Sequence, residues 1–291
     1  MDQGYMLEGS SDLMLHRSKL IINAALTGNV PTKTDVPNVP ITPDEIISDA
    51  RKCFAAGATF FHLHARDDDG KPSCKREIFE EIVFGIRKHC PGSVICVTAG
   101  GRIFKTFEER SAILDIEGEL KPEFASLTLG SINFPADVSV NSPNIIQSLA
   151  KAMLSKGIRP ELEIFDTGML NYAAYLTRKG FLRSPFHFNL FFGLLGTMPA
   201  RMVDMCHLVQ SLPQNSTWAS AGGGKFQLSV NTAAILMGGH VRTGIEDNFY
   251  YDHEKNIPAT NEMLVERLAR LAKELGRPVA NSSEARGILG L

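Results

Sequence analysis

The chain lacks paired cysteines, long apolar runs and an excess of charge of either sign. Its five cysteines are an odd number in 291 residues and form no Cys-x-x-Cys pair, so we expect free thiols in a reducing compartment. The 30 Lys and Arg residues nearly balance the 32 Asp and Glu residues, which favours neither nucleic acid nor an anionic membrane as a partner. No stretch approaches the roughly 20 apolar residues that a membrane helix needs.

The first residues of the chain also lack the features of a secretory signal. Residues 1–18 carry acidic side chains and no continuous apolar core. We therefore expect a mobile N-terminal tail over residues 1–18, a catalytic domain over residues 19–291, and a cytoplasmic protein. Hydrophobic residues make up 44% of the chain and charged residues 21%, a balance typical of globular proteins.

The chain contains a repeated alternation of strand-like and helix-like patterns. Eight short runs rich in β-branched or aromatic residues are predicted as strands, at residues 20–26, 59–64, 94–98, 124–129, 161–165, 187–192, 217–221 and 240–243. Clear helical patterns lie between them, at residues 43–56, 75–89, 143–156, 168–179, 200–211 and 260–275. Two further helices are weakly marked, at residues 107–114 and 228–237.

Helix start signals agree with these boundaries. Thr42 and Ser142 are each followed by proline, which places an N-cap residue before a proline at the first helical position. Eight β–α units without a Pro/Gly/Ser linker predict one α/β domain, a (β/α)8 TIM barrel, with a doubly wound open sheet as the alternative. Active sites of such barrels lie at the C-terminal ends of the strands, so polar residues there are the candidates.

A pair of histidines ends the second predicted strand. His62 and His64 point to the same face, about 6.6 Å apart, and can bind one metal ion; the alternative is two hydrogen-bonded core histidines. Glu246, after the eighth strand, is the candidate third ligand, unless it belongs to a solvent-facing acidic loop. The set suits catalytic zinc and also non-haem iron. His240 is a rival ligand, but it lies deeper in its strand, and we expect a supporting or core role.

Other polar residues near the strand ends suggest chemistry on an anion. Arg242 suits an anionic substrate or a developing enolate, and it can also pair structurally with Glu163 across the barrel. Asp247 is a candidate acid/base; a helix N-cap or a partner for a metal-bound histidine is the alternative. The loop at residues 222–225 is a candidate phosphate site or a plain tight turn, and it does not match a Walker pattern.

Several segments together make the chain similar to the beta-keto acid cleavage enzymes. They span residues 20–290 in the family's order. The segments are Asn23-Ala24-Ala25-Leu26-Thr27-Gly28, Pro37-Asn38-Val39-Pro40-Ile41-Thr42-Pro43, His62-Leu63-His64, Gly70-Lys71-Pro72-Ser73, Thr98-Ala99-Gly100-Gly101, Lys121-Pro122-Glu123, Ser131-Ile132-Asn133-Phe134 and Gly238-Gly239-His240-Val241-Arg242-Thr243-Gly244-Ile245-Glu246-Asp247-Asn248.

This resemblance implies a TIM barrel with one zinc ion per chain and acetyl-CoA as co-substrate. The reaction it implies condenses a beta-keto acid with acetyl-CoA and ends in a retro-Claisen cleavage to acetoacetate and a new acyl-CoA. By position, His62, His64 and Glu246 match the zinc ligands. Arg242 and Asp247 match residues implicated in proton abstraction. The resemblance also implies a homotetramer.

The resemblance further implies substrate contacts, with one departure. Four positions match substrate-contacting residues of the family: Thr98, Gly101, Ser126 and Glu163. Where a member acting on a 5-amino substrate has an acidic residue that pairs with the ammonium group, this chain has Val30. We therefore expect a beta-keto acid without the 5-amino group and with an apolar tail. Lys33 raises the weaker alternative of an anionic distal group.

Two other functions fit the same metal-ligand pattern. One is a different metal-dependent barrel enzyme, a hydrolase or an aldolase, which would turn over without acetyl-CoA. The other is a non-catalytic barrel that binds a metal or a ligand, which would show no CoA-dependent turnover. Metal analysis and an acetyl-CoA assay separate all three.

Overall fold

The computed structural model describes residues 18–291 and shows a closed barrel of eight parallel strands in the order β1-β12-β11-β10-β9-β6-β5-β2. This confirms the predicted barrel and excludes the open sheet. The strands are β1 (Ile22–Ala25), β2 (Phe60–Leu63), β5 (Val94–Val97), β6 (Phe124–Thr128), β9 (Arg159–Ile164), β10 (Phe186–Phe192), β11 (Ser216–Gly222) and β12 (His240–Thr243). The expected tail over residues 1–18 lies, up to residue 17, outside the described residues.

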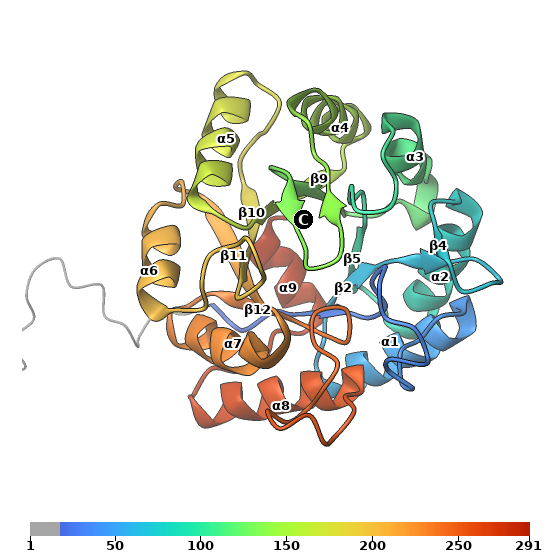
Figure 1. Cartoon of the computed structure of the whole chain (residues 1–291), viewed down its shortest axis with the longest axis vertical. Helices are drawn as coiled ribbons and strands as arrows, with labels where there is room; N and C mark the ends of the chain where they lie inside the picture. Colours follow the sequence, from blue (N-terminus) through green and yellow to red (C-terminus); the bar gives the residue numbers. More distant parts are fainter. Residues whose placement is uncertain (1–17) are drawn as a thin grey trace, which may run out of the picture.

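Helices surround the barrel in a ring, as Figure 1 shows. They are α1 (Pro43–Ala56), α2 (Arg76–His89), α3 (Phe107–Ser111), α4 (Pro143–Lys156), α5 (Thr167–Arg178), α6 (Met202–Gln210), α7 (Gln227–Leu236) and α8 (Asn261–Glu274). Short 3-10 segments are η1 (Ala112–Asp115), η2 (Gly118–Leu120) and η3 (Gly224–Phe226). None of the described helices is long and apolar enough to cross a membrane.

The predicted helix boundaries hold where the capping signals are strong. Thr42 accepts a hydrogen bond from the backbone N–H of Glu45, and the Glu45 side chain accepts one from Thr42, which completes a capping box at the start of α1. The weakly marked helix at residues 107–114 is shorter than expected. It ends at Ser111, and the chain continues as the 3-10 segment η1.

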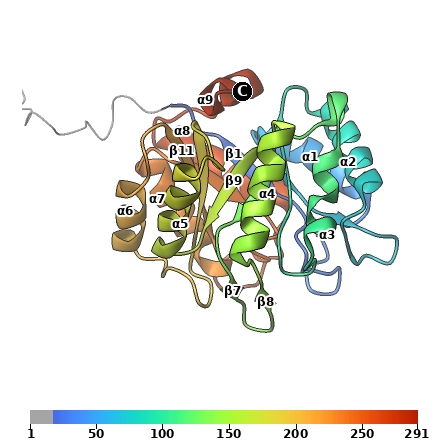
Figure 2. The same ribbon diagram turned by 90° about the horizontal axis from the view of Figure 1, so that it is seen from above.

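The two ends of the barrel are built differently. The final helix α9 (Ser282–Leu289), which was not among the predicted elements, packs across the N-terminal end of the strands. Its Leu289 joins an apolar cluster with Ile21, Phe60, Val94 and Phe124. Figure 2 shows α9 at the opposite end from the hairpin of β7 (Ile132–Asn133) and β8 (Val138–Ser139). The C-terminal end, with this hairpin and that of β3 (Ala65–Arg66) and β4 (Pro72–Ser73), stays available for a site.

Candidate active site with a metal-binding centre

Three side chains that could hold a metal ion meet at the C-terminal end of β2 and β12. His62 Nε2 and His64 Nε2 lie 3.3 Å apart. Glu246 Oε1 lies 3.2 Å from His64 Nε2 and 3.8 Å from His62 Nε2. Gly28, at a φ of +66°, makes room for this carboxylate, because a Cβ atom there would lie 2.7 Å from Glu246 Cγ. The structure thus brings together the three predicted ligands.

The donor atoms of this cluster fit a tetrahedral zinc ion. His62 Nδ1 bonds to Glu161 Oε2 at 3.1 Å, and His64 Nδ1 bonds to Asn29 Oδ1 at 3.0 Å. Because both partners are acceptors, each ring holds its proton on Nδ1, and the two Nε2 lone pairs face each other. Zinc–nitrogen bonds of about 2.0–2.1 Å place tetrahedral ligands about 3.3 Å apart, close to the observed spacings. Glu246 Oε2 is buried and has no hydrogen-bond partner among the described residues, so an acceptor there is free for a cation.

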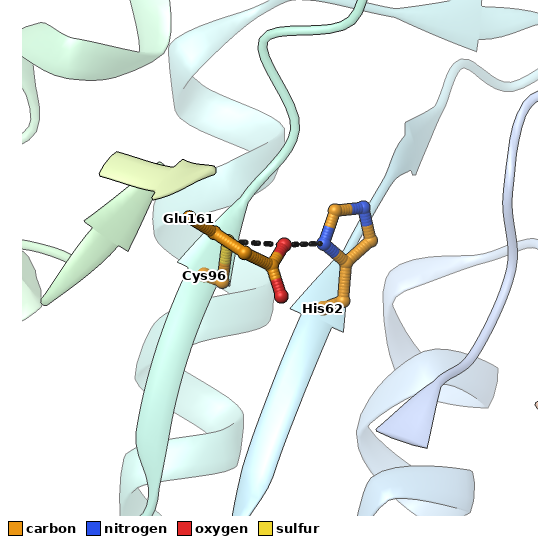
Figure 3. Close-up of side chains that lie close together, drawn as sticks. All are labelled: His62, Cys96 and Glu161. Carbon is orange, nitrogen blue, oxygen red and sulfur yellow. Dashed lines mark hydrogen bonds and ion pairs between the residues drawn. The ribbon is translucent and has the colours of Figure 1, made fainter. Parts of the chain in front are cut away.

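The fully buried carboxylate of Glu161 holds the His62 ring in place through Nδ1. Figure 3 shows the Glu161 carboxylate between the His62 ring and Cys96, whose Sγ lies 3.4 Å from Oε2. Asn23 and Asn189 donate to Glu161 Oε1 at 3.0 and 3.3 Å. Burial opposes ionisation of Glu161, but the hydrogen bond and charge of His62, with Arg242, bring its pKa to about 2. The carboxylate is therefore ionised and fixes the tautomer and direction of His62.

His62, Cys96 and Glu161, which we call the lower group, also have the composition of a metal site. A metal ion there would need the Cys96 thiolate. Burial, followed by the charge of Glu161, raises the pKa of the Cys96 thiol well above its usual value, so Cys96 stays a thiol. His62 can offer Nε2 to the upper cluster while Nδ1 bonds to Glu161. The lower group therefore supports the ligand set of His62, His64 and Glu246.

Arg242 connects the metal-binding cluster to a second carboxylate. Its Nη2 donates to Glu246 Oε1 at 2.7 Å, and its Nε donates to Asp247 Oδ2 at 2.9 Å. Burial opposes its charge, but Asp247 and Glu246 raise the pKa of Arg242 well above its usual value. Nη1 is buried without a hydrogen-bond partner among the described residues, and Glu163 Oε1 lies 3.9 Å from it. Arg242 is therefore a cation at the candidate site and, at the same time, lies near Glu163, so the structure is compatible with both sequence-based interpretations.

The carboxylates of the site have different charge states. Burial opposes ionisation of Glu246, but His64, Arg242 and His62 outweigh it and hold its pKa well below the usual range. For Asp247, burial and the nearby Glu246 charge outweigh Arg242 and raise the pKa. The Glu246 carboxylate is thus kept ionised beside Asp247, a carboxylate that takes up a proton more readily.

A cavity of about 300 Å³ opens onto these groups. Its wall includes eight of the predicted site residues: Val30, His62, His64, Thr98, Glu163, Arg242, Glu246 and Asp247. The rest of the wall is largely apolar, with Ile132, Phe134, Phe165, Phe191, Leu194 and Phe249. The cavity therefore combines a charged set of residues with a largely apolar remaining wall, which also includes Arg102.

Two predicted substrate-contacting residues do not line this cavity. Ser126 Oγ accepts a hydrogen bond from the backbone N–H of Ala99 at 3.0 Å. Gly101 packs so closely that a Cβ atom would lie 2.4 Å from the carbonyl oxygen of Val140. In the structure, both residues shape the loop that follows β5 and carries Thr98.

Sequence reasoning left other residues of the site out. Glu161 lies two positions before Glu163 on one predicted strand, so the two side chains share a face of the barrel. The sequence assigns Glu161 no role of its own. Asn29 follows the first predicted strand and Thr128 shares a face with Ser126 in the fourth, but the sequence assigns neither a role; in the structure Asn29 orients His64 and Thr128 donates to Glu163. His240, the rival ligand, accepts a hydrogen bond from the backbone of Ile21 at 3.1 Å, so the core role expected for it fits the structure.

Comparisons with known proteins agree with the geometry. A family model described as beta-keto acid cleavage enzyme matches residues 19–291. The chain is 44% identical over 275 residues to the 3-keto-5-aminohexanoate cleavage enzyme of Acetoanaerobium sticklandii, covering 94% of this chain and 98% of that protein. It is 39% identical over 274 residues to the 3-oxoadipate:acetyl-CoA acetyltransferase of Cupriavidus necator, covering 93% and 94%.

Solved structures confirm the fold. The apo structure of ObcA superposes with a TM-score of 0.76 at 18% sequence identity, covering 88% of this chain and 66% of that one. At this identity the likeness extends to the barrel and not to its chemistry. The family match over nearly the whole chain and the two close relatives decide the assignment: the chain is an enzyme of the beta-keto acid cleavage enzyme family.

Proposed function

We propose that this enzyme converts a beta-keto acid and acetyl-CoA into acetoacetate and a new acyl-CoA, with one metal ion per chain. The observation that carries the proposal is the single cavity in which His62, His64 and Glu246 lie beside the pair of Arg242 and Asp247. A cation-binding set and a charged acid/base pair are what enolate chemistry needs at one carbon atom. The names of the two relatives, a keto acid cleavage enzyme and an acetyl-CoA acetyltransferase, support this reaction.

Zinc is the metal we propose, held by His62, His64 and Glu246. Two imidazoles and one carboxylate are a common catalytic zinc set, with three protein ligands. When bound, zinc supplies a Lewis acid that polarises the keto group of the substrate. The same three ligand types also suit non-haem iron, so metal analysis is part of the test.

The side chains carry the proton and the charge. Asp247 takes a proton from the carbon between the keto and carboxylate groups, and Nη1 of Arg242 donates to the enolate oxygen. The enolate carbon then bonds to the acetyl carbonyl carbon. The acetyl thioester C–S bond breaks, and the CoA sulfur bonds to the former keto carbon. The bond between the former keto carbon and the former enolate carbon then breaks. Asp247 returns its proton to the departing acetoacetate, so atoms and charges balance.

The apolar part of the cavity wall favours an uncharged substrate tail. Val30 is 43% exposed and lines the cavity, and it offers no charge to an ammonium group. Arg102 also lines the cavity, but Asp137 binds its Nε at 3.0 Å. Lys33 does not line the cavity and forms an ion pair with Glu45 at 2.8 Å, which favours the uncharged tail over an anionic distal group. We propose a beta-keto acid without the 5-amino group and with an apolar tail.

The test is an acetyl-CoA-dependent assay over 3-keto-5-aminohexanoate and matched uncharged analogues, with metal analysis of the same protein. We expect about one zinc per chain, turnover only with acetyl-CoA, and faster turnover of the uncharged acids. Turnover without acetyl-CoA would identify a hydrolase or aldolase, and metal without turnover would identify a binding protein. Faster cleavage of the amino substrate would overturn the interpretation of Val30.

A pair of variants sharpens the test of the tail. Val30→Glu should raise the kcat/KM ratio of the amino substrate over its uncharged analogue by about tenfold, the size of one favourable charge pair in a partly buried site. Val30→Gln has the same length without the charge and is the matched control. Equal ratios in the two variants would show that charge at position 30 does not act on the tail.

A further inference from the structure

A second, larger space adjoins the catalytic cavity. Two further cavities, of about 380 and 320 Å³, share Lys225, Tyr250 and His253 with each other. The first of them shares Asp247 and Phe249 with the catalytic cavity. The three cavities therefore adjoin one another through shared wall residues. We call the two further cavities together the outer groove, and define it by Lys225, Tyr250, Tyr251, His253, Lys255 and Arg267.

Three segments of the last two β–α units build the outer groove. Lys225 lies in η3, directly after the glycines that end β11. The loop over residues 244–260 joins β12 to α8 and is drawn in orange to red beside α8 in Figure 1. Arg267 comes from α8. The loops after the seventh and eighth strands of such barrels often bind phosphate groups.

The groove has cations without ionic partners. Lys225 and Lys255 have no ion pair among the described residues. Arg267 stacks on the Tyr251 ring at 4.2 Å, and its Nε is buried without a hydrogen-bond partner in the described part of the chain. Arg267 also donates from Nη1 to the backbone carbonyl of Tyr251 at 2.5 Å, so the two lysines are the groups available to an anionic ligand.

The acidic residues of the groove are already engaged. Asp247 pairs with Arg242, and Asp252 accepts the backbone N–H groups of Asn256 and Ile257 at 3.0 and 2.7 Å. Lys225, Lys255 and Arg267 outnumber Asp252, the acidic residue of the groove that has no ion pair among the described residues, so the groove presents net positive charge to a ligand. This favours an anion with more than one negative group.

Other cations around the barrel mouth differ from those of the groove. Arg66 donates to the carbonyl oxygens of Gly28, Gly70 and Pro31, and Lys105 donates to three carbonyl oxygens of its surroundings. These cations hold loops together. In the described part of the mouth, the outer groove combines lysine ammonium groups that have no ion pair, aromatic rings and a wall that includes Asp247.

We propose that the outer groove binds the phosphorylated nucleotide end of acetyl-CoA. Lys225 and Lys255 contact the phosphate groups, and Arg267 with Tyr250 and Tyr251 forms the surface for phosphate and adenine. The pantetheine arm then passes Phe249 and brings the thioester to Asp247 and Arg242. The assignment rests on the proposed function for its choice of nucleotide, while the charge and the wall residues shared with the catalytic cavity come from the groove itself.

The test measures binding apart from turnover. Isothermal titration calorimetry with adenosine 3′,5′-bisphosphate and with CoA compares the native enzyme, the double variant Lys225→Ala/Lys255→Ala and the control Lys33→Ala, whose lysine is paired with Glu45 outside the groove. We expect the double variant to weaken both ligands by at least about tenfold, and the control to bind as the native enzyme does. Thermal unfolding of each variant checks that the fold is retained. Equal binding by the double variant and the native enzyme would overturn the assignment.

Kinetics separate this inference from the proposed function. In the double variant the KM for acetyl-CoA should rise by about tenfold, while turnover with acetyl-pantetheine, which lacks the nucleotide, should stay at the native level. An unchanged KM for acetyl-CoA refutes the groove and leaves the reaction standing. Bisphosphate binding that depends on the two lysines, without turnover of any keto acid, supports the groove and refutes the reaction.

Discussion

Each end of the barrel buries two histidines, and their neighbours differ. At the open end, His62 and His64 bond through Nδ1 to a carboxylate and an amide oxygen, with Glu246 at their Nε2 atoms. At the end closed by α9, the Nδ1 atom of His187 bonds to the hydroxyl of Thr217 at 2.9 Å, and the Nδ1 atom of His240 accepts a backbone N–H group. Burial alone therefore does not mark a metal ligand.

The electrostatics of the two ends follow from these neighbours. Burial lowers the pKa of His187 to about 4, and burial with Arg277 lowers that of His240 well below its usual value. Burial and Arg242 also act against the charge of His62, but Glu246 and Glu161 outweigh them and raise its pKa. For His64, burial outweighs Glu246 and lowers the pKa, so contact of a carboxylate with the ring, and not the direction of the pKa shift, distinguishes the candidate ligands from the core histidines.

The largest expected effect comes from replacing a histidine at the open end of the barrel and, as a control, one at the closed end. His62→Ala should lose the metal and reduce turnover by about a thousandfold or more, because a ligand of the site is gone. His240→Asn, the control from the closed end, should keep one metal ion per chain. Plasma mass spectrometry of the purified variants measures this. Full zinc occupancy in His62→Ala would remove that residue from the ligand set.

Glu246→Ala tests the third ligand in the same way. Without this carboxylate, we expect metal content and activity to fall together, as with His62→Ala. The variant also removes a partner of Arg242, so its unfolding midpoint is recorded alongside the metal analysis. A variant that keeps full metal content but loses activity would place Glu246 in catalysis and not in metal binding.

Removal of Arg242 should separate chemistry from metal binding. Arg242→Ala keeps all three ligands, so we expect full metal content with kcat lowered by about a hundredfold to a thousandfold, as for the loss of one transition-state donor. Steady-state assays with acetyl-CoA and the preferred keto acid measure it. Near-native rates would rule out the catalytic role of Arg242.

A smaller effect is expected from the carboxylate beneath His62. Glu161→Gln keeps the shape and an acceptor oxygen but removes the charge, so metal affinity should fall by about tenfold to a hundredfold. Competition with a chelator of known affinity gives the constant for each protein. Unchanged affinity would reduce Glu161 to a packing role.

The smallest effect concerns stability at the closed end. The folded-state pKa of His187, about 4, lies below the unfolded value of about 6.5, so its contribution to stability is full above pH 6.5 and is lost as pH falls toward 4. His187→Asn does not titrate there. Between pH 7 and pH 5 the native enzyme should lose on the order of 1 to 2 kcal/mol more than the variant, measured by urea unfolding. If the native enzyme and the variant lose the same free energy of unfolding between pH 7 and pH 5, His187 has the same pKa in the folded and unfolded states.

Much of the fold could be predicted from local patterns. The alternation of apolar runs and capped helices located all eight barrel strands, and strong signals such as that at Thr42 fixed helix starts. The final helix α9 escaped prediction because its role, covering the barrel end, depends on contacts with Ile21 and Phe60, far away in the sequence.

The site was predictable where residues follow strand ends, and less so where distant contacts decide. His62, His64, Glu246, Arg242 and Asp247 all follow or end predicted strands. The hydrogen bond from Glu161 to His62 joins residues 99 positions apart, which no local pattern reveals. The tetramer and the cytoplasmic location stay predictions, because they depend on contacts and surroundings beyond a single chain.

The most direct test of whether acetyl-CoA supplies two carbon atoms of acetoacetate follows these atoms through the reaction. Acetyl-CoA carrying carbon-13 in both acetyl carbons is turned over with the preferred keto acid, and the products are analysed by NMR and mass spectrometry. We expect acetoacetate labelled only at its ketone and methyl carbons, together with an unlabelled new acyl-CoA. Unlabelled acetoacetate, or cleavage of the keto acid without acetyl-CoA, would contradict this expectation.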